Sequence, residues 1–258
     1  MKPEDRRARL VDIVREHGRV SVETLAERLK ISRETIRRDL TELSDRGLVR
    51  KYHGGAFAPE ITGEGAFQAR LSLNMHRKRT IARHASALFQ SGDTLFIDTG
   101  STTVFFAEEL STRSGITVIT NSVSIASIMA RGSDGTRVFM IGGEYHDEAA
   151  ENVGALAVEQ ISRFSAQHVV LTVAALDQSG AMDFDLQEAE VARAMIERAK
   201  EVTIILDSSK FDKTALFGVC SLDTIDRIVC EEPPPRRLAD ALRAASVEVV
   251  IGEKGLPC

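Results

Sequence analysis

Cysteine is scarce in this chain of 258 residues, which contains only Cys220, Cys230 and Cys258. Their number is odd, they show no Cys-x-x-Cys spacing, and no histidines cluster near them. This pattern is typical of reduced thiols in a cytoplasmic protein, and it argues against both a disulfide framework and a metal site. We therefore expect no metal ligands and no cofactor.

Long apolar runs are also absent. No stretch approaches the 18 consecutive apolar residues that indicate a transmembrane helix. The first residues, Met1 to Asp5, lack the apolar run of a signal peptide. Neither internal repeats nor low-complexity tracts stand out. The sequence therefore favours a cytoplasmic protein that makes no contact with a membrane.

Charge is distributed unevenly along the chain. Residues 1–58 contain 14 Lys and Arg against 10 Asp and Glu, a net charge of +4. Residues 59–258 contain 19 against 28, a net charge of −9. A basic segment attached to a larger acidic one can bind nucleic acid locally, while the acidic part avoids nonspecific adhesion. The asymmetry predicts a small domain that contacts a polyanion and a larger domain that does not.

The segment from Ser32 to Leu40 carries the strongest functional signal. Ile36, Leu40 and Leu43 recur at helical spacing, so they share one helix face that can be buried. Ser32 can cap the start of this helix, and the arginines remain on its other faces. The major groove of DNA accepts a helix of this kind. In isolation, the same pattern also fits a solvated charged face.

The flanking segments favour DNA binding. Helices are predicted over 6–16 and 22–29, and Lys30-Ile31 then connects the second of them tightly to the arginine-containing helix. Two short helices joined in this way form a helix-turn-helix. Residues 48–56 have strand character with a Gly-Gly bend, as in the wing of a winged helix or in a simple closing hairpin. The candidate DNA-binding residues are Ser32, Arg33, Thr35, Arg37, Arg38, Arg50, Lys51 and His53.

Beyond a Gly- and Pro-containing stretch at 58–65, short apolar runs alternate with longer amphipathic segments. Strands are predicted over 94–97, 116–119, 137–141, 168–173, 202–206, 227–229 and 247–251. Helices are predicted over 76–89, 103–110, 123–130, 153–161, 186–199 and 236–244. This alternation predicts an α/β fold with a mostly parallel sheet covered on both faces. Ligands of such folds bind beyond the carboxyl ends of the strands.

Small and polar residues occupy those strand ends. Residues 98–103 follow the first strand and run into a helix, where a flexible glycine and free N–H groups suit a phosphate. Asp98 would repel a phosphate, so we place it toward a sugar or polyol hydroxyl. Residues 98–103 also fit an ordinary capped loop, and Lys210 also fits a surface lysine. The candidate effector-binding residues are Asp98, Gly100, Ser101, Thr102, Thr103, Asn121, Gly143, Asp177 and Lys210.

Motifs in both halves resemble a known family. Thr-Ile-Arg-Arg-Asp-Leu at 35–40 and His-Gly-Gly-Ala at 53–56, at this separation, resemble the N-terminal signature of the DeoR family of bacterial transcription regulators. Lys-x-x-Ile-Ala at 78–82, Asp-x-Gly-Ser-Thr-Thr at 98–103 and Asp-x-Ser-Lys-Phe at 207–211 are similar to the family's C-terminal sensor domain. Together the two matches cover nearly the whole chain.

The resemblance implies a fold and a domain order. It implies an N-terminal winged helix-turn-helix over 1–58 and a linker over 59–75. A Rossmann-like sensor domain over 76–258 would follow, related in fold to ribose-5-phosphate isomerase.

The resemblance also implies a function and partners. The expected protein is a repressor of a carbohydrate or polyol catabolic operon, not an enzyme, so no catalytic residues are expected. It would bind a double-stranded DNA operator and a phosphorylated sugar or polyol. Residues 182–188 are similar to the corresponding segment of glycerol-3-phosphate regulon repressors. A single DNA-binding head would bind weakly, so a homodimer or homotetramer is expected.

Two positions depart from the family pattern. Ala174-Ala175 stand where the family often has a Gly-rich stretch, so the floor of the pocket is expected to differ. Ala192 stands where many members have a lysine. A cationic contact is therefore expected to be missing there if that lysine touches the ligand.

Two other functions compete with this interpretation. A sugar-phosphate isomerase on the same fold would use Asp98 and Asp177 as acid–base carboxylates and Lys210 as an electrostatic stabiliser. A winged helix has no obvious use in such an enzyme. A DNA-binding protein without an effector is the other alternative, and stabilisation by a phosphorylated ligand would exclude it.

Overall fold

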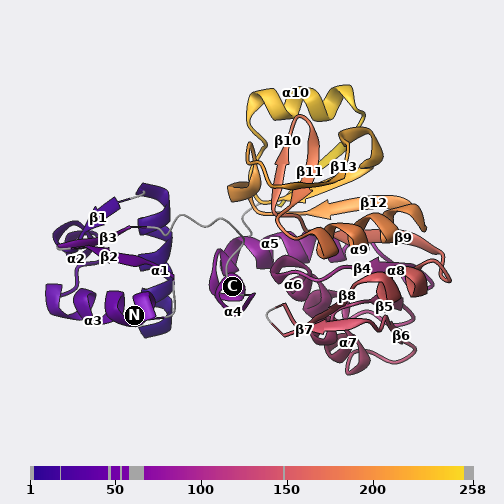
Figure 1. Ribbon diagram of the computed structural model, residues 1–258, viewed down its shortest axis with the longest axis horizontal. Helices are drawn as coiled ribbons and strands as arrows, with labels where there is room; N and C mark the ends of the chain where they lie inside the picture. Colours follow the sequence, from indigo (N-terminus) through magenta and orange to yellow (C-terminus); the bar gives the residue numbers. More distant parts are fainter. Residues whose placement is uncertain are drawn as a thin grey trace. The chain divides into compact units, whose positions relative to one another are not determined.

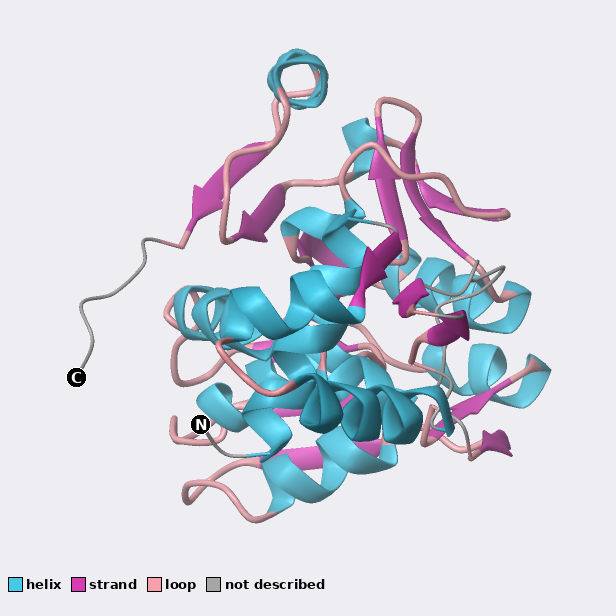
Figure 2. Cartoon of the chain, turned by 90° about the vertical axis from the view of Figure 1, so that its left-hand side faces the viewer, coloured by secondary structure: helices cyan, strands magenta, loops and turns pink. Residues whose placement is uncertain are grey.

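The computed structural model describes residues 3–17, 19–45, 48–52, 54–57, 67–147 and 149–252. The chain divides into two compact units, Met1–Asn74 and Met75–Cys258 (Figure 1). Both units combine helices with strands, and Figure 2 shows the helices and strands of the chain in different colours. The predicted boundary stretch at 58–65 and the candidate residue His53 lie outside the described residues. Within the described ranges, no helix combines the length and the apolar character needed to cross a membrane.

The N-terminal unit contains the predicted helix-turn-helix and wing. Its helices are α1 (Pro3–His17), α2 (Val22–Leu29), α3 (Arg33–Asp45) and α4 (Phe67–Ser72). Its strands are β1 (Arg19–Ser21), β2 (Arg50–Tyr52) and β3 (Gly55–Phe57), which form an antiparallel sheet in the order β1-β3-β2. Leu10, Val14, Leu25, Ile36 and Leu40 are at most 1% exposed and form the centre of its core. The helices therefore pack by the apolar faces that periodicity predicts.

The C-terminal unit is built on a parallel sheet of seven strands. These are β4 (Thr94–Ile97), β5 (Thr117–Thr120), β6 (Arg137–Met140), β9 (Ala166–Leu171), β12 (Ala199–Ile205), β14 (Arg227–Cys230) and β15 (Glu248–Ile251). They lie in the order β15-β14-β12-β9-β4-β5-β6. All neighbouring pairs are parallel. The predicted α/β fold class is confirmed, because each predicted strand overlaps one of these seven.

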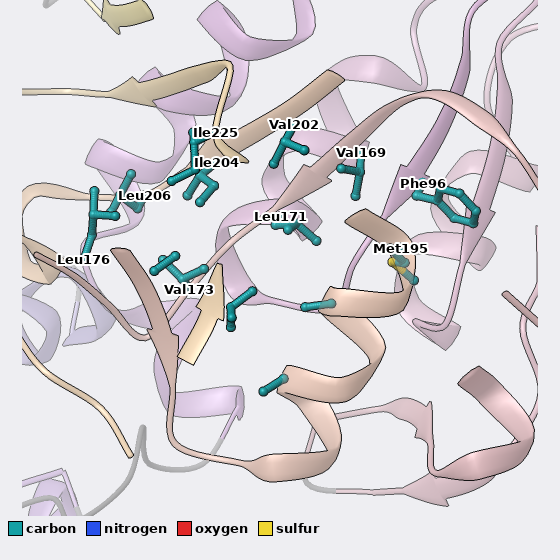
Figure 3. Packing of buried hydrophobic residues seen from close by; sticks show 14 of the residues in the cluster. Phe96, Val169, Leu171, Val173, Leu176, Met195, Val202, Ile204, Leu206 and Ile225 are labelled. Carbon is teal, nitrogen blue, oxygen red and sulfur yellow. The ribbon is translucent and has the colours of Figure 1, made fainter. Parts of the chain in front are cut away.

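Helices cover both faces of this sheet. They are α5 (Met75–Ser86), α6 (Ser101–Leu110), α7 (Val123–Ala130), α8 (Ala155–Ile161), α9 (Leu186–Glu197) and α10 (Arg236–Ala244). Helices α5, α6 and α7 pack together, whereas α8, α9 and α10 share a second apolar cluster. In that cluster, Phe96 of β4, Val169 of β9 and Val202 of β12 lie on the same side as Met195 of α9 (Figure 3). Apolar burial of this kind is the main stabilising contribution to such a domain.

Two small sheets were not predicted from the sequence. One pairs β7 (Glu144–His146) with β8 (Glu151–Val153), and the other joins β10 (Ala175–Asp177), β11 (Gly180–Asp183) and β13 (Phe217–Cys220). Strand β8 ends at Val153 and Gly154 precedes α8, so the helix predicted from residue 153 begins at Ala155 instead. The extra strands have three or four residues each, and each includes a charged residue or a glycine, so none stands out as an apolar run.

The order of the parallel strands reverses between β4 and β9. From β4 the chain continues outward through β5 and β6, and from β9 it continues in the opposite direction through β12, β14 and β15. Ligands of doubly wound sheets bind at such a topological switch point, outside the carboxyl ends of the strands. The loops after β4 and β9 are therefore the first place to look for a ligand site.

Candidate functional site

The turn between α2 and α3 is closed by local hydrogen bonds. Lys30 ends α2 in the left-handed conformation (φ 55°), and the N–H of Ile31 donates to the carbonyl of Ala26 at 3.0 Å. The Ser32 hydroxyl accepts the N–H of Thr35 at 3.2 Å. The predicted cap at Ser32 is thus confirmed, because its hydroxyl satisfies an N–H that has no partner within the helix. The two candidate hydroxyl residues, Ser32 and Thr35, fix where α3 begins.

Helix α3 separates buried apolar residues from exposed arginines. Ile36, Leu40 and Leu43 are at most 2% exposed. The three candidate arginines Arg33, Arg37 and Arg38 are all exposed. Arg33 lies 3.7 Å from Glu23, and Arg38 lies 3.5 Å from Glu34. Such exposed pairs contribute little, so a more highly charged anion can displace them.

The wing depends on two adjacent glycines. Gly54 turns the β2–β3 hairpin with φ +99°, a conformation that side chains rarely adopt. A Cβ at Gly55 would lie 2.3 Å from the carbonyl oxygen of Val20 and 2.5 Å from the hydroxyl of Tyr52. The Gly-Gly pair is therefore required by the hairpin turn and by its close packing on β1.

A hollow of about 400 Å³ lies between α3 and the wing. Arg37, Thr41, Lys51 and Tyr52 are among its lining residues. Lys51 is exposed, and its Nζ donates to the Thr41 hydroxyl at 2.9 Å. The helix and the wing therefore present cations to the same hollow. For Arg50 the backbone lies in β2, but the side chain lies outside the described part of the structure.

A buried ion pair that the sequence did not reveal joins α1 to α3. Asp39, 2% exposed, accepts from Arg6 Nε at 2.5 Å and Arg6 Nη2 at 3.0 Å, and from Arg7 Nε at 3.1 Å. Burial alone would raise the pKa of the Asp39 carboxyl, but the hydrogen bonds from Arg6 and Arg7 outweigh it, and the pKa is lowered. Asp39 thus positions α3 without contacting a ligand.

The lowered pKa of Asp39 predicts that the N-terminal unit is sensitive to acid. Ionised Asp39 contributes stability above its unfolded pKa of about 3.9, and this contribution is lost as the pH falls through the lower folded value. The chain has no tryptophan and two tyrosines, Tyr52 and Tyr145. In a Tyr145→Phe background, tyrosine fluorescence reports on the wing alone. We expect the wing to unfold at lower urea concentrations below about pH 4, and unchanged midpoints from pH 5 to pH 3 would contradict this.

In the C-terminal unit, the loops after β4 and β9 meet at the switch point. Asp98 follows β4, and its carboxylate accepts the N–H of Thr99 at 2.7 Å. Gly100 follows, and a Cβ added there would lie 2.0 Å from Cγ2 of Thr172, which comes directly after β9. Gly100 is thus required for this close approach. Because Gly100 has no side chain, only backbone atoms stand directly before the first residue of α6.

The start of α6 carries free donors and a buried cation. Its first intrahelical bond runs from the Val104 N–H to the Gly100 carbonyl, so the preceding N–H groups have no partner within the helix. Lys78 of α5 is 3% exposed, and its Nζ donates to the Ser101 hydroxyl at 2.8 Å. The sequence analysis did not select Lys78. The signal was present, however, because Lys78 shares a helix face with Ile81, Ala82 and Ala85.

The candidate hydroxyl residues of α6 differ in availability. Ser101, Thr102 and Thr103 are 7%, 3% and 0% exposed. The Thr103 hydroxyl donates to the carbonyl of Gly100 at 3.0 Å, so it stabilises the helix start. Ser101 instead faces the ammonium group of Lys78.

Candidate residue Asn121, after β5, is held in a buried polar network. Its Nδ2 donates to Glu151 Oε2 at 3.0 Å and to the carbonyl of Asn152 at 3.2 Å. Its Oδ1 accepts from the Thr99 hydroxyl at 3.3 Å. The amide therefore links the loop after β4 to β8. The sequence analysis missed Glu151 and Asn152 because it predicted no strand there.

Two further carboxylates act on the charge of Asp98. Burial raises the pKa of Asp98 well above its ordinary value, and the negative charges of Glu188 and Asp183 raise it further. The N–H of Thr99 acts in the opposite direction. A carboxyl group with a raised pKa can donate a hydrogen bond as well as accept one. The site thus combines a cationic side, at Lys78 and α6, with a carboxylate side that suits hydroxyl groups.

The remaining candidate residues lie in other surroundings. The Asp177 carboxylate accepts the N–H of Ser179 at 2.7 Å in the β10–β11 turn, and Asp177 lines a surface hollow with Arg237. Lys210 ends a short 3-10 helix after β12, Ser208–Lys210. At Gly143, an added Cβ would lie 2.5 Å from the carbonyl oxygen of Val153, so close packing requires glycine there. For these three residues, effector contact stays a prediction from the sequence.

The positions that depart from the family pattern are buried. Ala174 is 4% exposed and donates its N–H to the carbonyl of Met182 at 3.1 Å. Ala175 is completely buried in β10, and Ala192 of α9 is 4% exposed within the apolar cluster. Ala192 therefore contributes to packing. Within the described residues, no group of three or more His, Cys, Asp or Glu side chains is placed to hold a metal ion.

Two family models match this chain. Residues 6–62 match the DeoR-like helix-turn-helix domain, and residues 73–232 match the DeoR C terminal sensor domain. The second match alone covers more than half of the chain. The two matched segments contain, respectively, the arginine face of α3 and the switch-point loops of the parallel sheet.

Similar proteins include named repressors. The glycerol-3-phosphate regulon repressor of Escherichia coli (strain K12) is 31% identical over 236 residues, which cover 91% of this chain and 93% of that protein. The transcriptional repressor AccR of Agrobacterium fabrum is 32% identical over 231 residues, covering 88% of this chain and 89% of that protein. Among solved structures, ribose 5-phosphate isomerase A of Methanocaldococcus jannaschii matches with a TM-score of 0.39. Its sequence identity is 14%, and the match covers 53% of this chain and 54% of that one.

Proposed function

The chain belongs to the DeoR family of bacterial transcriptional regulators, and on that basis we propose that it represses a carbohydrate or polyol catabolic operon under the control of a phosphorylated effector. It is a DNA-binding regulator and not an enzyme, as its relatives are named transcriptional repressors. The observation that carries the proposal is the division of α3 into a buried apolar side and an exposed arginine side.

In this proposal α3 lies in the major groove of a double-stranded operator. Arg33, Arg37 and Arg38 contact base edges and phosphates, because an arginine can donate two parallel hydrogen bonds to guanine or to a phosphate. Ser32 and Thr35 contact the backbone near the helix start. Lys51 and the other wing candidates, Arg50 and His53, bind phosphates that position the helix. Selection of DNA fragments from a random duplex library tests this proposal, because the bound fragments should share repeated half-sites.

The effector site in this proposal is the switch point. The phosphate lies at the start of α6, where the free N–H groups, the Ser101 hydroxyl and the Lys78 ammonium group converge. The hydroxyl groups of the effector face Asp98 and Asn121. Gly100 allows the close approach of the backbone, and Thr102 and Thr103 contribute their N–H groups. Asp177, Gly143 and Lys210 remain predicted contacts.

Glycerol-3-phosphate is the first effector to test. The name of the Escherichia coli relative, the glycerol-3-phosphate regulon repressor, supports this choice. The test is a thermal-shift titration of the full chain with glycerol-3-phosphate, ribose 5-phosphate, glycerol and inorganic phosphate. A ligand at a hundred times its Kd stabilises the native state by about 2.7 kcal/mol. If none of the phosphorylated compounds raises the Tm, the effector part of the proposal is contradicted.

Replacing Lys78 by methionine should remove most of the stabilisation by the phosphorylated effector. Methionine keeps the buried apolar stem but lacks the charge that holds the phosphate, so we expect an affinity loss of about tenfold or more. The measurement compares the ligand-induced rise in the Tm of the variant with the ligand-induced rise in the Tm of the wild type. Lys200→Met, at an exposed position of β12, is the control. An undiminished rise in Lys78→Met would remove Lys78 from the site.

The regulatory step requires that effector binding and DNA binding are coupled. The protein then has one state that binds DNA and one that does not. The effector must bind the second state more tightly than the first, by about 1–3 kcal/mol for ordinary coupling. We further propose a homodimer or homotetramer, which places two heads on two half-sites. The division into a DNA-binding domain at 1–58, a linker at 59–75 and a sensor domain at 76–258 belongs to the same proposal, as does a cytoplasmic location.

A further inference from the structure

Helix α5 carries a row of exposed basic side chains on the C-terminal unit. We call His76, Arg79 and Arg83 the α5 basic stripe. Their spacing of three and four residues places them on one face of the helix, and all three are exposed. Arg77 and Lys78 of the same helix have other partners, at Ser208 and Ser101 respectively. The stripe is thus distinct from the effector site.

No ion pair involves the stripe within the described residues. Arg79 lies over the ring of Phe105, 5.5 Å from its centre, and Arg83 has no carboxylate partner there. Other exposed arginines of this unit do have such partners, for example Arg163 with Glu159 at 2.7 Å and Arg243 with Asp240 at 2.9 Å. The two arginines of the stripe are therefore not used to neutralise nearby acidic groups.

The charge of the stripe is opposite to that of the segment that contains it. Residues 59–258 carry a net charge of −9, yet α5, Met75–Ser86, contains no Asp or Glu. Helix α5 also begins at the first residue after the N-terminal unit. The arginines of the α5 basic stripe thus present positive charge, without nearby carboxylate partners among the described residues, to anions outside the fold.

We propose that the α5 basic stripe binds the phosphate backbone of duplex DNA. This inference rests on the proposed function, since it assumes that the protein binds DNA. His76 and Arg83 are about 10 Å apart along the helix axis, at roughly 1.5 Å per residue. One DNA strand carries a phosphate about every 3.4 Å of duplex axis, so the stripe matches about three phosphates. The sensor domain thereby adds affinity that is independent of sequence.

The test measures how DNA affinity depends on salt. The Arg79→Ala/Arg83→Ala variant of the full chain is compared with the wild type on a selected operator duplex, from 50 to 300 mM KCl. Each lost phosphate contact lowers the slope of log K against log salt by about 0.9, so we expect a decrease of about two per protomer. Affinity should fall about tenfold or more at 100 mM KCl, with no change in sequence preference. Arg236→Ala/Arg237→Ala, which removes two exposed cations from α10, is the matched control.

A second duplex makes the test sharper. Trimming the base pairs that flank the half-sites should lower the DNA affinity of the wild type and of the α10 control. It should not lower the DNA affinity of the α5 variant further. An unchanged salt slope in the α5 variant would overturn the inference while leaving the proposed function intact. A change of oligomeric state in sedimentation, without a change of slope, would overturn it in favour of a second copy of the chain. If the wild type binds no selected DNA, the proposed function itself fails.

Discussion

Replacing Arg37 or Arg38 by alanine is expected to abolish operator binding while leaving folding and effector binding intact. Both side chains are exposed on α3, opposite the buried Ile36 and Leu40, so neither contributes to the core. A bidentate arginine contact contributes about 1–3 kcal/mol of discrimination, and a homodimer on two half-sites loses it twice. Fluorescence anisotropy on a selected operator duplex at physiological salt measures the loss.

The control for this experiment is Arg9→Ala. Arg9 is an exposed arginine of α1 in the same unit, so its removal changes the net charge equally. We expect it to leave specific binding nearly unchanged. Operator affinities equal to the wild type in both Arg37→Ala and Arg38→Ala would show that α3 is not the reading helix. If the effector raises the Tm of all variants by the same amount, the C-terminal unit is unaffected by the substitutions.

Replacing Asp39 by alanine is expected to destabilise the N-terminal unit by about 3 kcal/mol, because it leaves two arginines without their buried partner. The value lies at the lower end of the usual range because the Arg6 and Arg7 side chains are 16% and 23% exposed and can be hydrated again. DNA binding should therefore be lost together with the fold of the winged helix. In a Tyr145→Phe background, urea unfolding followed by Tyr52 fluorescence measures the change.

Glu34→Ala serves as the matched control for Asp39→Ala. Glu34 also pairs with an arginine, Arg38, but both side chains are exposed, so the pair contributes about 0.3–0.5 kcal/mol. The two substitutions remove the same charge from the same helix and differ chiefly in burial. If both substitutions shift the urea midpoint equally, the buried pair stabilises the fold no more than the exposed pair does.

The sequence predicts the N-terminal unit well because its signals are local. The period of Ile36, Leu40 and Leu43, the cap at Ser32 and the paired glycines each depend on neighbours within a few residues. Asp39 could not be interpreted in the same way. Its partners Arg6 and Arg7 lie more than thirty residues away, and only the packing of α1 on α3 brings them together.

The C-terminal unit shows a similar limit. Its seven parallel strands are apolar runs that the sequence shows clearly, whereas β10, β11 and β13 form a separate sheet and each contain a glycine or an aspartate. Consequently the sequence does not connect Asp183, the last residue of β11, with Asp98. Lys78 lies in the predicted helix over 76–89, and helical spacing alone does not show that a lysine is buried. Its burial arises from α6, which packs on α5 from a later part of the chain.

The contact between Gly100 and Thr172 has a consequence for how effector preference can change. A Cβ at position 100 would clash with Thr172, so glycine is needed where the backbone approaches the anion in the proposed site, and Lys78 and Ser101 are the side chains that contact the same anion. The groups that face the rest of the effector, Asp98, Asp183 and Glu188, are side chains on separate segments. Anion binding and the recognition of the sugar or polyol are therefore separable by mutation. Redesign toward a new inducer should vary the carboxylates and leave the glycine in place.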